Sequence, residues 1–211
     1  ELPLFAQRIA VISSANAAGY GDFCHQLNDN SNGLKFYTRL FPAVMQGEEI
    51  EQSVIAALNK INQRMDDFDV VVIIRGGGAT SDMSGFDTLS LSENVANFPL
   101  PVITGIGHDR DESVLDMVSH TRVKTPTAAA AFLVDHLEEV YERVLDAQTE
   151  LLTSVRHRME MEKAQLQHLG EKIPMLFSLY KERQETMLDH WLQALTTAIQ
   201  THLVQETHRL E

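Results

Sequence analysis

The chain has 211 residues, of which 44% are hydrophobic and 22% charged, the composition of a globular protein with a sizeable buried core. Its formal net charge of -13 excludes indiscriminate binding to a polyanion, because such binding depends on a cationic field. The single cysteine, Cys24, excludes an internal disulfide and favours a reducing compartment. The sequence contains neither an apolar run of membrane-spanning length nor a leader, so we expect a cytoplasmic protein with no membrane contact.

Predicted strands and helices alternate along the first half of the chain. Apolar runs predict strands over 8–13, 34–41, 70–74 and 101–106, and helical spacing of apolar residues predicts helices over 23–27, 47–65, 87–97 and 113–118. We expect the small-residue stretch 14–22 (SANAAGYGD) to be a loop that ends at Asp22. This alternation is typical of βαβ units, so it predicts an α/β fold, a Rossmann-like domain built on a parallel sheet.

The central strand of this domain runs directly into an arginine and three glycines, in the sequence VVVIIRGGG. Its Val and Ile residues show no polar alternation, which is typical of a strand buried on both faces. Gly76, Gly77 and Gly78 lack Cβ atoms, so their N–H groups can approach an anion, and Arg75 can donate to phosphate oxygens. The stretch predicts a phosphate site, but an ordinary turn after the strand explains these residues equally well.

The loops that follow three of the predicted strands should meet at one edge of the sheet. Parallel strands all point the same way, so the loops after residues 13, 74 and 106 emerge together, where open α/β sheets bind their ligands. Asp22, Arg75, His108 and Asp111 lie in these loops or just beyond them. We therefore expect the four side chains to line one crevice.

The four side chains would supply the groups that phosphodiester hydrolysis needs. Arg75 and the glycine amides would neutralise charge on the phosphate, and His108 would act as general acid or base or attack phosphorus itself. Asp111, one helical turn beyond His108, would orient the imidazole, and Asp22 would add a second carboxylate. Taken singly, a histidine and an aspartate at these positions are also typical of the start of a helix.

A divalent metal site is the alternative chemistry for this edge. The side chains that could hold Mg²⁺ are acidic residues and one histidine: Asp22, Asp82, Asp87, His108, Asp109 and Asp111. Their spacing matches no strict ligand motif, so Mg²⁺ stays an alternative and no cofactor is required by the sequence. A zinc site is disfavoured, because the chain has no cysteine pair.

The second half of the chain predicts long amphipathic helices. Thr125 and Pro126 form a helix start, and apolar residues then recur at helical spacing: Leu133, Leu137, Tyr141, Val144, Leu151 and Val155. We expect Pro174 to end this helix and a second amphipathic helix to cover 187–204, giving an antiparallel coiled coil or a helical arm. A bundle packed on itself is the alternative.

These observations predict two domains, an α/β domain over 1–125 and a helical, coiled-coil arm over 126–211. Both ends of the chain look cut. The chain begins at Glu1 without a methionine, and Leu210-Glu211 resembles the junction to a purification tag. We therefore expect a fragment of a longer protein.

Three linked blocks closely resemble the catalytic domain of the large subunit of exonuclease VII. The blocks are RGGGATSDMSGFD, PLPVITGIGHDRDESVLDMVSHTR and VKTPTAAAAF. The family writes them as RGGGS-x-EDL-x-x-F, P-x-PV-[IV]-[ST]-x-[IV]-GHE-x-D and TP-[ST]-AAAE. The resemblance covers roughly residues 2–132 and the helical region that follows, in the same order and with similar spacing.

The resemblance implies an exodeoxyribonuclease that degrades single-stranded DNA from either end to short oligonucleotides. The family's implicated aspartate, arginine, histidine and second aspartate correspond to Asp22, Arg75, His108 and Asp111. The family is described as having no strict need for a divalent metal. Its arm collects several copies of a small helical subunit, which implies a hetero-oligomer, and its N-terminal OB-fold is absent from this fragment.

The chain departs from the family pattern at several positions near the expected site. Ala79 and Ser81 replace a serine and a glutamate after the glycines, and Gly21 stands where an arginine is usual. Asp109 and Ala131 replace two further glutamates. Without the basic, aromatic surface of an OB-fold, we expect this fragment alone to bind DNA weakly and to show little or no activity. A non-catalytic assembly module that recruits small helical subunits, and a phosphometabolite-binding enzyme, are the alternative functions.

Overall fold

The computed structural model describes residues 1–76, 84–107 and 113–210. Its strands are β1 (Arg8–Ser13), β2 (Tyr37–Pro42), β3 (Val70–Ile74), β4 (Val102–Gly105) and β5 (Thr121–Arg122). Its α-helices are α1 (Ala18–Asn28), α2 (Ile50–Asn62), α3 (Leu89–Ala96), α4 (Val114–Val118) and α5 (Pro126–Leu210), with short 3-10 helices η1 (Met65–Asp67) and η2 (Ser84–Phe86). The chain divides into two compact units, Glu1–Asp146 and Ala147–Glu211.

The first unit is built on a five-stranded sheet in the order β2-β1-β3-β4-β5, and every strand pair is parallel. This confirms the predicted α/β fold with a parallel sheet. The order reverses between β1 and β3, since the chain runs outward from β1 to β2 and then returns to the other side of β1. Such a reversal opens a crevice at the carboxyl ends of the two strands, where doubly wound sheets bind ligands.

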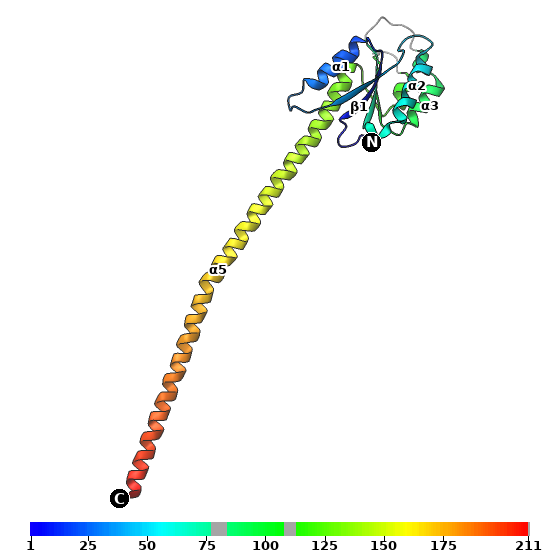
Figure 1. Cartoon of the computed structure of the whole chain (residues 1–211). Helices are drawn as coiled ribbons and strands as arrows, with labels where there is room; N and C mark the ends of the chain where they lie inside the picture. Colours follow the sequence, from blue (N-terminus) through cyan, green and yellow to red (C-terminus); the bar gives the residue numbers. More distant parts are fainter. Residues whose placement is uncertain (77–83, 108–112, 211) are drawn as a thin grey trace. The chain divides into compact units, whose positions relative to one another are not determined.

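Helices cover both faces of the sheet (Figure 1). On one face, α2 and α3 pack on alternate residues of the central strands, including Ile12, Val71 and Ile73. On the other face, α1 and the first turns of α5 pack on Val11 and Val72. All five residues of β3 are buried, which confirms that the unbroken apolar run is a central strand.

The start of α1 differs from the prediction. The sequence predicted a loop up to Asp22, but the helix already begins at Ala18, so the expectation of a loop is wrong. Glycine is a poor helix former, and a propensity argument therefore delays the helix past Gly19 and Gly21. Tertiary packing overrides this preference because Gly19 is buried where two other segments of the chain approach closely.

The other elements of the first unit follow the prediction with shifted ends. β2 begins at Tyr37 rather than at residue 34, and it lies at the edge of the sheet. The two-residue strand β5 was missed, because a strand of this length carries no periodicity. The helix start predicted at Thr125 is confirmed, since its hydroxyl accepts a hydrogen bond of 3.1 Å from the N–H of Ala128.

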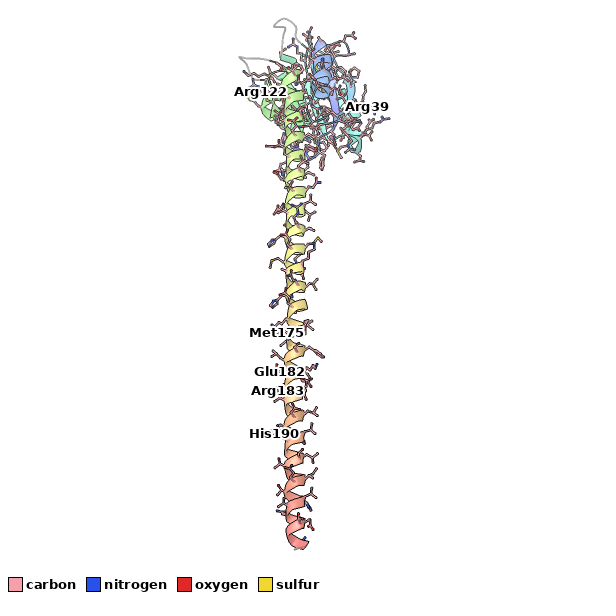
Figure 2. All side chains as sticks on the ribbon, turned by 90° about the vertical axis from the view of Figure 1, so that its left-hand side faces the viewer. Arg39, Arg122, Met175, Glu182, Arg183 and His190 are labelled. Carbon is pink, nitrogen blue, oxygen red and sulfur yellow. The ribbon has the colours of Figure 1, made fainter. Side chains whose placement is uncertain are left out.

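Helix α5 passes through Pro174 without a break, so the expected helix end and second helix are wrong. Proline removes one backbone hydrogen bond and costs about 3 kcal/mol inside a helix. Good helix formers such as Glu, Lys, Leu, Met and Gln flank the position on both sides, and together they outweigh one proline. Met175, Glu182 and Arg183 project from α5 beyond this point (Figure 2).

Among the described residues, no helix is long and apolar enough to cross a membrane.

Candidate functional site

Three parallel strands end side by side at the carboxyl edge of the sheet. Ile12 of β1 is paired with Ile73 of β3, and Ile74 at the end of β3 is paired with Gly105 at the end of β4. Gly107 has a φ of +83°, a left-handed conformation that side chains disfavour, and it turns the chain just after β4. The chain therefore leaves β1, β3 and β4 toward the same region, as the parallel topology predicted.

Arg75 is a charged residue at this edge. It follows the last residue of β3, its backbone N–H donates to the carbonyl of Gly105 over 3.4 Å, and only 6% of its surface is exposed. A guanidinium is always charged, and burying it is costly unless anionic or polar groups surround it. Such burial is typical of an arginine that binds a phosphate or a carboxylate.

The backbone around Arg75 is held by a close approach of three segments. A Cβ added to Gly19 would lie 2.9 Å from Cα of Gly76, 2.9 Å from Cγ of Pro126 and 3.3 Å from the carbonyl oxygen of Arg75. Real Cβ atoms do not come so close, so only glycine lets the first turn of α1 touch this backbone. The packing fixes the end of β3 against the starts of α1 and α5.

A hollow of about 570 Å³ opens beside Arg75, within the size range of ligand pockets. Its walls come from the end of β3, the loop between β1 and α1, and the loop between β2 and α2. The lining residues are Ser14, Asn16, Ala17, Ala18, Ala43, Val44, Met45, Gln46, Arg75 and Gly76. The hollow lies at the β1/β3 reversal of strand order, the place that the topology assigns to a ligand.

The start of α1 forms part of the wall of the hollow, through Ala17 and Ala18. Ala17 is the N-cap residue, its side chain has no acceptor, and no described side chain makes the capping hydrogen bond. The N–H groups of a first helical turn carry the positive end of the helix dipole and mostly lack partners within the helix. In α1 one of them, the N–H of Tyr20, donates to the carbonyl of Ala17 over 3.1 Å. Ala17, Ala18 and Arg75 all line the hollow, so a helix start and a charged residue lie at the same place.

The structure places only part of the predicted site. Arg75 and Gly76 both line the hollow. Asp22 is exposed in the second turn of α1 and is not among the residues that line the hollow. His108, Asp111, Gly77 and Gly78 lie outside the described residues, so their predicted roles stay predictions.

Sequence reasoning missed the wall that the loop after β2 contributes. Only the loops after residues 13, 74 and 106 entered the prediction, but β2 is parallel to β1, so its carboxyl end faces the same edge. Val44, Met45 and Gln46 come from this loop, and Ser14 and Asn16 from the loop after β1. Applying the same topological rule to the strand predicted over 34–41 would have found them.

Two of the aspartates named for the Mg²⁺ alternative, Asp22 and Asp87, lie among the described residues. Among the described residues, no group of three or more His, Cys, Asp or Glu side chains lies close enough to hold a metal ion. Asp87 accepts a hydrogen bond of 2.8 Å from the backbone N–H of Val114. The other aspartates named for Mg²⁺, apart from Asp22, lie outside the described residues, as does His108.

A doubly wound α/β unit, with a buried arginine and the start of a helix beside a hollow at its switch point, defines an α/β protein with a crevice at the carboxyl edge of its sheet. Comparison with known proteins identifies the family. The family model described as exonuclease VII, large subunit, matches residues 1–211. This chain belongs to that family.

Curated relatives include exodeoxyribonuclease 7 large subunits from several bacteria. That of Cyanothece sp. (strain PCC 7425) is 35% identical over 212 residues, covering 99% of this chain and 49% of the relative. That of Lactobacillus gasseri is 32% identical over 95% of this chain and 44% of the relative. That of Thermotoga sp. (strain RQ2) is 30% identical over 83% and 43%. The chain spans about half the length of the curated relatives it matches.

Proposed function

We propose that the chain is the catalytic part of an exodeoxyribonuclease large subunit, which hydrolyses phosphodiester bonds of single-stranded DNA from either end and releases oligonucleotides. The α/β unit supplies the nuclease site, and the arm supplies the surface for small helical subunits. The observation that carries the proposal is that Arg75, which is only 6% exposed, lines the hollow at the place where the strand order reverses. A DNA phosphate is the anion that the family name suggests for this place.

In the proposed reaction, Arg75 and the first-turn amides of α1 bind the non-bridging oxygens of the scissile phosphate. They offset the negative charge that grows on these oxygens as water attacks phosphorus. His108 transfers a proton at the attacking or leaving oxygen, Asp111 orients its imidazole, and Asp22 is the second carboxylate. Gly77 and Gly78 extend the amide groups available to the phosphate.

The test measures cleavage by the full-length large subunit with its small partner. Substrates are single-stranded oligonucleotides labelled at the 5′ or the 3′ end, with a duplex of the same sequence for comparison. We expect His108→Ala to lower kcat by about 10²–10⁴-fold, the usual contribution of a general acid or base. Arg75→Ala should lower kcat by about 10²–10³-fold, as for other groups that stabilise developing negative charge.

Matched controls are His25→Ala and Arg64→Ala, which remove exposed residues of α1 and of the turn after α2. Both controls should keep wild-type activity. Full activity in both site variants would refute the proposed site. Loss of all activity in a chelator, restored by Mg²⁺, would favour the carboxylate–metal alternative instead.

The proposed partners of the arm are several copies of a small helical subunit. From residue 147 onward the side chains of α5 are exposed, except for Gln184 and the side chains that the structure does not describe. The exposed side chains include large apolar ones such as Leu166, Ile173, Phe177 and Trp191. An isolated helix this apolar on its surface gains stability when an amphipathic helix covers it, because apolar burial contributes about 25 cal/mol per Å². This assembly role complements the nuclease role.

A further inference from the structure

A second hollow lies at the opposite edge of the sheet, at the amino ends of β1 and β2. Its volume is about 660 Å³, within the size range of ligand pockets. Arg8 and Tyr37, the first residues of the two strands, are partners in the sheet. The hollow therefore lies away from the carboxyl edge that holds Arg75. The lining residues are Phe5, Gln7, Arg8, Tyr37, Thr38, Arg39, Asp67, Phe68 and Asp69.

Two aromatic rings that line this hollow are exposed. Phe5 is 56% exposed and Tyr37 is 63% exposed. The third ring, Phe68, is buried and packs edge-on against Phe41, with 5.5 Å between the ring centroids, so it belongs to the core. Exposed rings beside polar groups are the surface on which the bases of a single nucleic-acid strand stack.

Arg39 places a positive charge beside these rings. It comes two residues after Tyr37 on the edge strand, so the two side chains point to the same face of the sheet. Its side chain lies at the surface of the sheet domain (Figure 2). The guanidinium lies over the ring of Phe41, at 5.7 Å from the centroid. Among the described residues, no carboxylate forms an ion pair with it.

The other charges that line the hollow offset one another. The guanidinium of Arg8 and the carboxylate of Asp69 form an ion pair at 2.6 Å. Their hydrogen bond and the charge of Asp69 raise the pKa of Arg8 above its ordinary value, and the charge of Asp67 adds to this effect. Of the described lining residues, Arg39 is therefore the cation that is left for a ligand.

The edge strand is locally cationic in an acidic chain. Residues 30–47 contain no Asp or Glu, although the chain has 30 acidic residues and a net charge of -13. The same stretch holds Lys35 and Arg39, both of which are exposed. A polyanion meets less repulsion along this strand than over most of the surface, because exposed charges act over only about 10 Å at moderate ionic strength.

We propose that this hollow is an accessory site for single-stranded DNA, in which a base stacks on Tyr37 and Phe5 and the neighbouring phosphate binds Arg39. A DNA strand alternates flat bases with anionic phosphates. The hollow likewise alternates rings with polar and charged groups, rather than joining its rings in one apolar patch. This inference rests on the proposed function, which supplies single-stranded DNA as the substrate.

The hollow binds the strand at a distance from the bond that is cleaved. β1 and β2 have six residues each, so their amino ends lie about 20 Å from the carboxyl edge of the sheet. A strand that reaches both places runs beside the edge strand β2. The accessory site therefore contributes to the affinity for the strand and not to the chemical step.

The probe is a short single-stranded oligonucleotide with one 2-aminopurine, a base whose fluorescence falls when it stacks on an aromatic ring. Phosphorothioate linkages protect the probe from cleavage while it is titrated with this chain. We expect Tyr37→Leu to weaken binding by about 5–100-fold and to restore the fluorescence, whereas Tyr37→Phe, which keeps the ring, stays within about 2-fold of wild type. Arg39→Gln should reduce the slope of log affinity against log salt by about 0.7, the value for one lost phosphate contact.

Tyr141→Leu and Arg64→Gln are the matched controls, since both remove exposed side chains outside the hollow. Both should bind like wild type, and a duplex of the same sequence should bind more weakly because its bases are already stacked. Wild-type affinity in Tyr37→Leu, equal losses in Tyr37→Leu and Tyr37→Phe, or no binding by wild type would each overturn the inference. So would weaker binding of the small helical subunit by Tyr37→Leu with unchanged DNA binding, because the hollow would then contact a protein.

Cleavage by the full-length large subunit with its small partner separates this inference from the proposed function. We expect Tyr37→Leu to raise KM for single-stranded DNA at least about 5-fold, with a smaller change in kcat. If Arg75→Ala keeps full activity while Tyr37→Leu loses binding, the proposed site fails and the accessory site stands. If Arg75→Ala loses activity while Tyr37→Leu binds and cleaves like wild type, only the accessory site fails.

Discussion

At the scale of single residues, Asp69 fixes the starts of two neighbouring strands. It precedes β3, and its Oδ2 accepts from the backbone N–H groups of Gln7 and Arg8 over 3.1 and 2.7 Å. Its Oδ1 accepts from the guanidinium of Arg8 at 3.0 and 2.6 Å. One carboxylate thus ties the beginning of β1 to the beginning of β3, at the edge of the sheet opposite the candidate site.

Asp69 should make the stability of the protein depend on pH in the acidic range. Burial by itself raises the pKa of the Asp69 carboxyl, but the hydrogen bonds and charge of Arg8 outweigh burial and lower this pKa below its ordinary value. A carboxyl with a lowered folded-state pKa stabilises the fold fully above its unfolded pKa of about 3.9, and loses this contribution as the pH falls through the lower folded pKa. The stability difference between wild type and Asp69→Asn should therefore shrink as the pH falls below about 4.

Urea unfolding of both proteins from pH 7 to pH 3 measures this difference, with Asp146→Asn as a control at an exposed aspartate of α5. Asp69→Ala, which removes all these acceptors, should lower the free energy of unfolding at pH 7 by about 1–3 kcal/mol. A wild-type advantage over Asp69→Asn that stays constant down to pH 3 would contradict the prediction.

The close packing of Gly19 gives a second prediction. In Gly19→Ala the new Cβ would meet the backbone of Gly76 and the ring of Pro126, neither of which can move without shifting an element of the fold. We expect a loss of about 1–3 kcal/mol in the free energy of unfolding. Gly21→Ala is the matched control, since it lies in the same helix with nothing within 4 Å of the added Cβ. This control should gain up to about 1 kcal/mol, and equal losses in the two variants would contradict the explanation.

At the scale of elements, the sequence prediction was wrong for α5, because it relied on a local signal, the helix-breaking tendency of Pro174. Its first turns are part of the sheet domain, because Ala129, Ala130 and Leu133 are buried in the core. Further along, the helix continues without such support through Gly170 and Pro174. Both residues weaken a helix, so this stretch is where α5 is intrinsically least stable.

Pro174→Ala should stabilise α5. Alanine restores the backbone hydrogen bond to the carbonyl of Gly170 and should favour the helix by about 3 kcal/mol. Circular dichroism at 222 nm, followed through thermal unfolding of the whole chain, should show a higher midpoint for the helical arm. Ser178→Ala, at an exposed position one turn later, should change the midpoint far less. An unchanged or lower midpoint in Pro174→Ala would favour a chain that turns at this proline.

At the scale of the whole molecule, the net charge bears on DNA binding, and the exposed apolar surface bears on assembly with a partner. The chain carries a net charge of -13, so under the proposed function its affinity for DNA would come from local groups such as Arg75 rather than from a basic surface. The sheet domain has a core of buried apolar side chains, whereas the arm exposes large apolar side chains along its length. This arrangement is what the proposed assembly with a small helical subunit requires.

Trp191 offers a direct probe of that assembly. It is the chain's only tryptophan and is 70% exposed on the arm, so a covering partner should shift its fluorescence to shorter wavelength. Titration of the chain with the small helical subunit should show this shift. Leu195→Asp, one helical turn away, should weaken binding at least about 10-fold because it places a charge in the apolar contact. Gln193→Asp, on the opposite side of the helix, should leave binding unchanged, and equal weakening by both would contradict a specific apolar contact.

Sequence patterns were sufficient to predict a helix or strand wherever its signal is local or strictly periodic. β1, β3 and the start of α5 were predicted correctly, because unbroken apolar runs and a threonine–proline helix start depend on nearby residues alone. The position of Arg75 at the carboxyl edge of the sheet was also predicted, since the topology of a parallel sheet follows from the order of the elements. Three linked sequence blocks in the family's order were enough to identify the family.

Only the tertiary structure decided the features that depend on contacts between distant segments. Helix α1 begins before Asp22 because Gly19 packs on Gly76 and Pro126, a contact that no local propensity encodes. Asp87 accepts from Val114, 27 residues away, although its sequence context suggested a metal ligand. By itself the sequence determined which residue types reach the carboxyl edge of the sheet. The packing of α1, β3 and α5 determined which of them line the hollow, because side-chain position depends on close contact between elements.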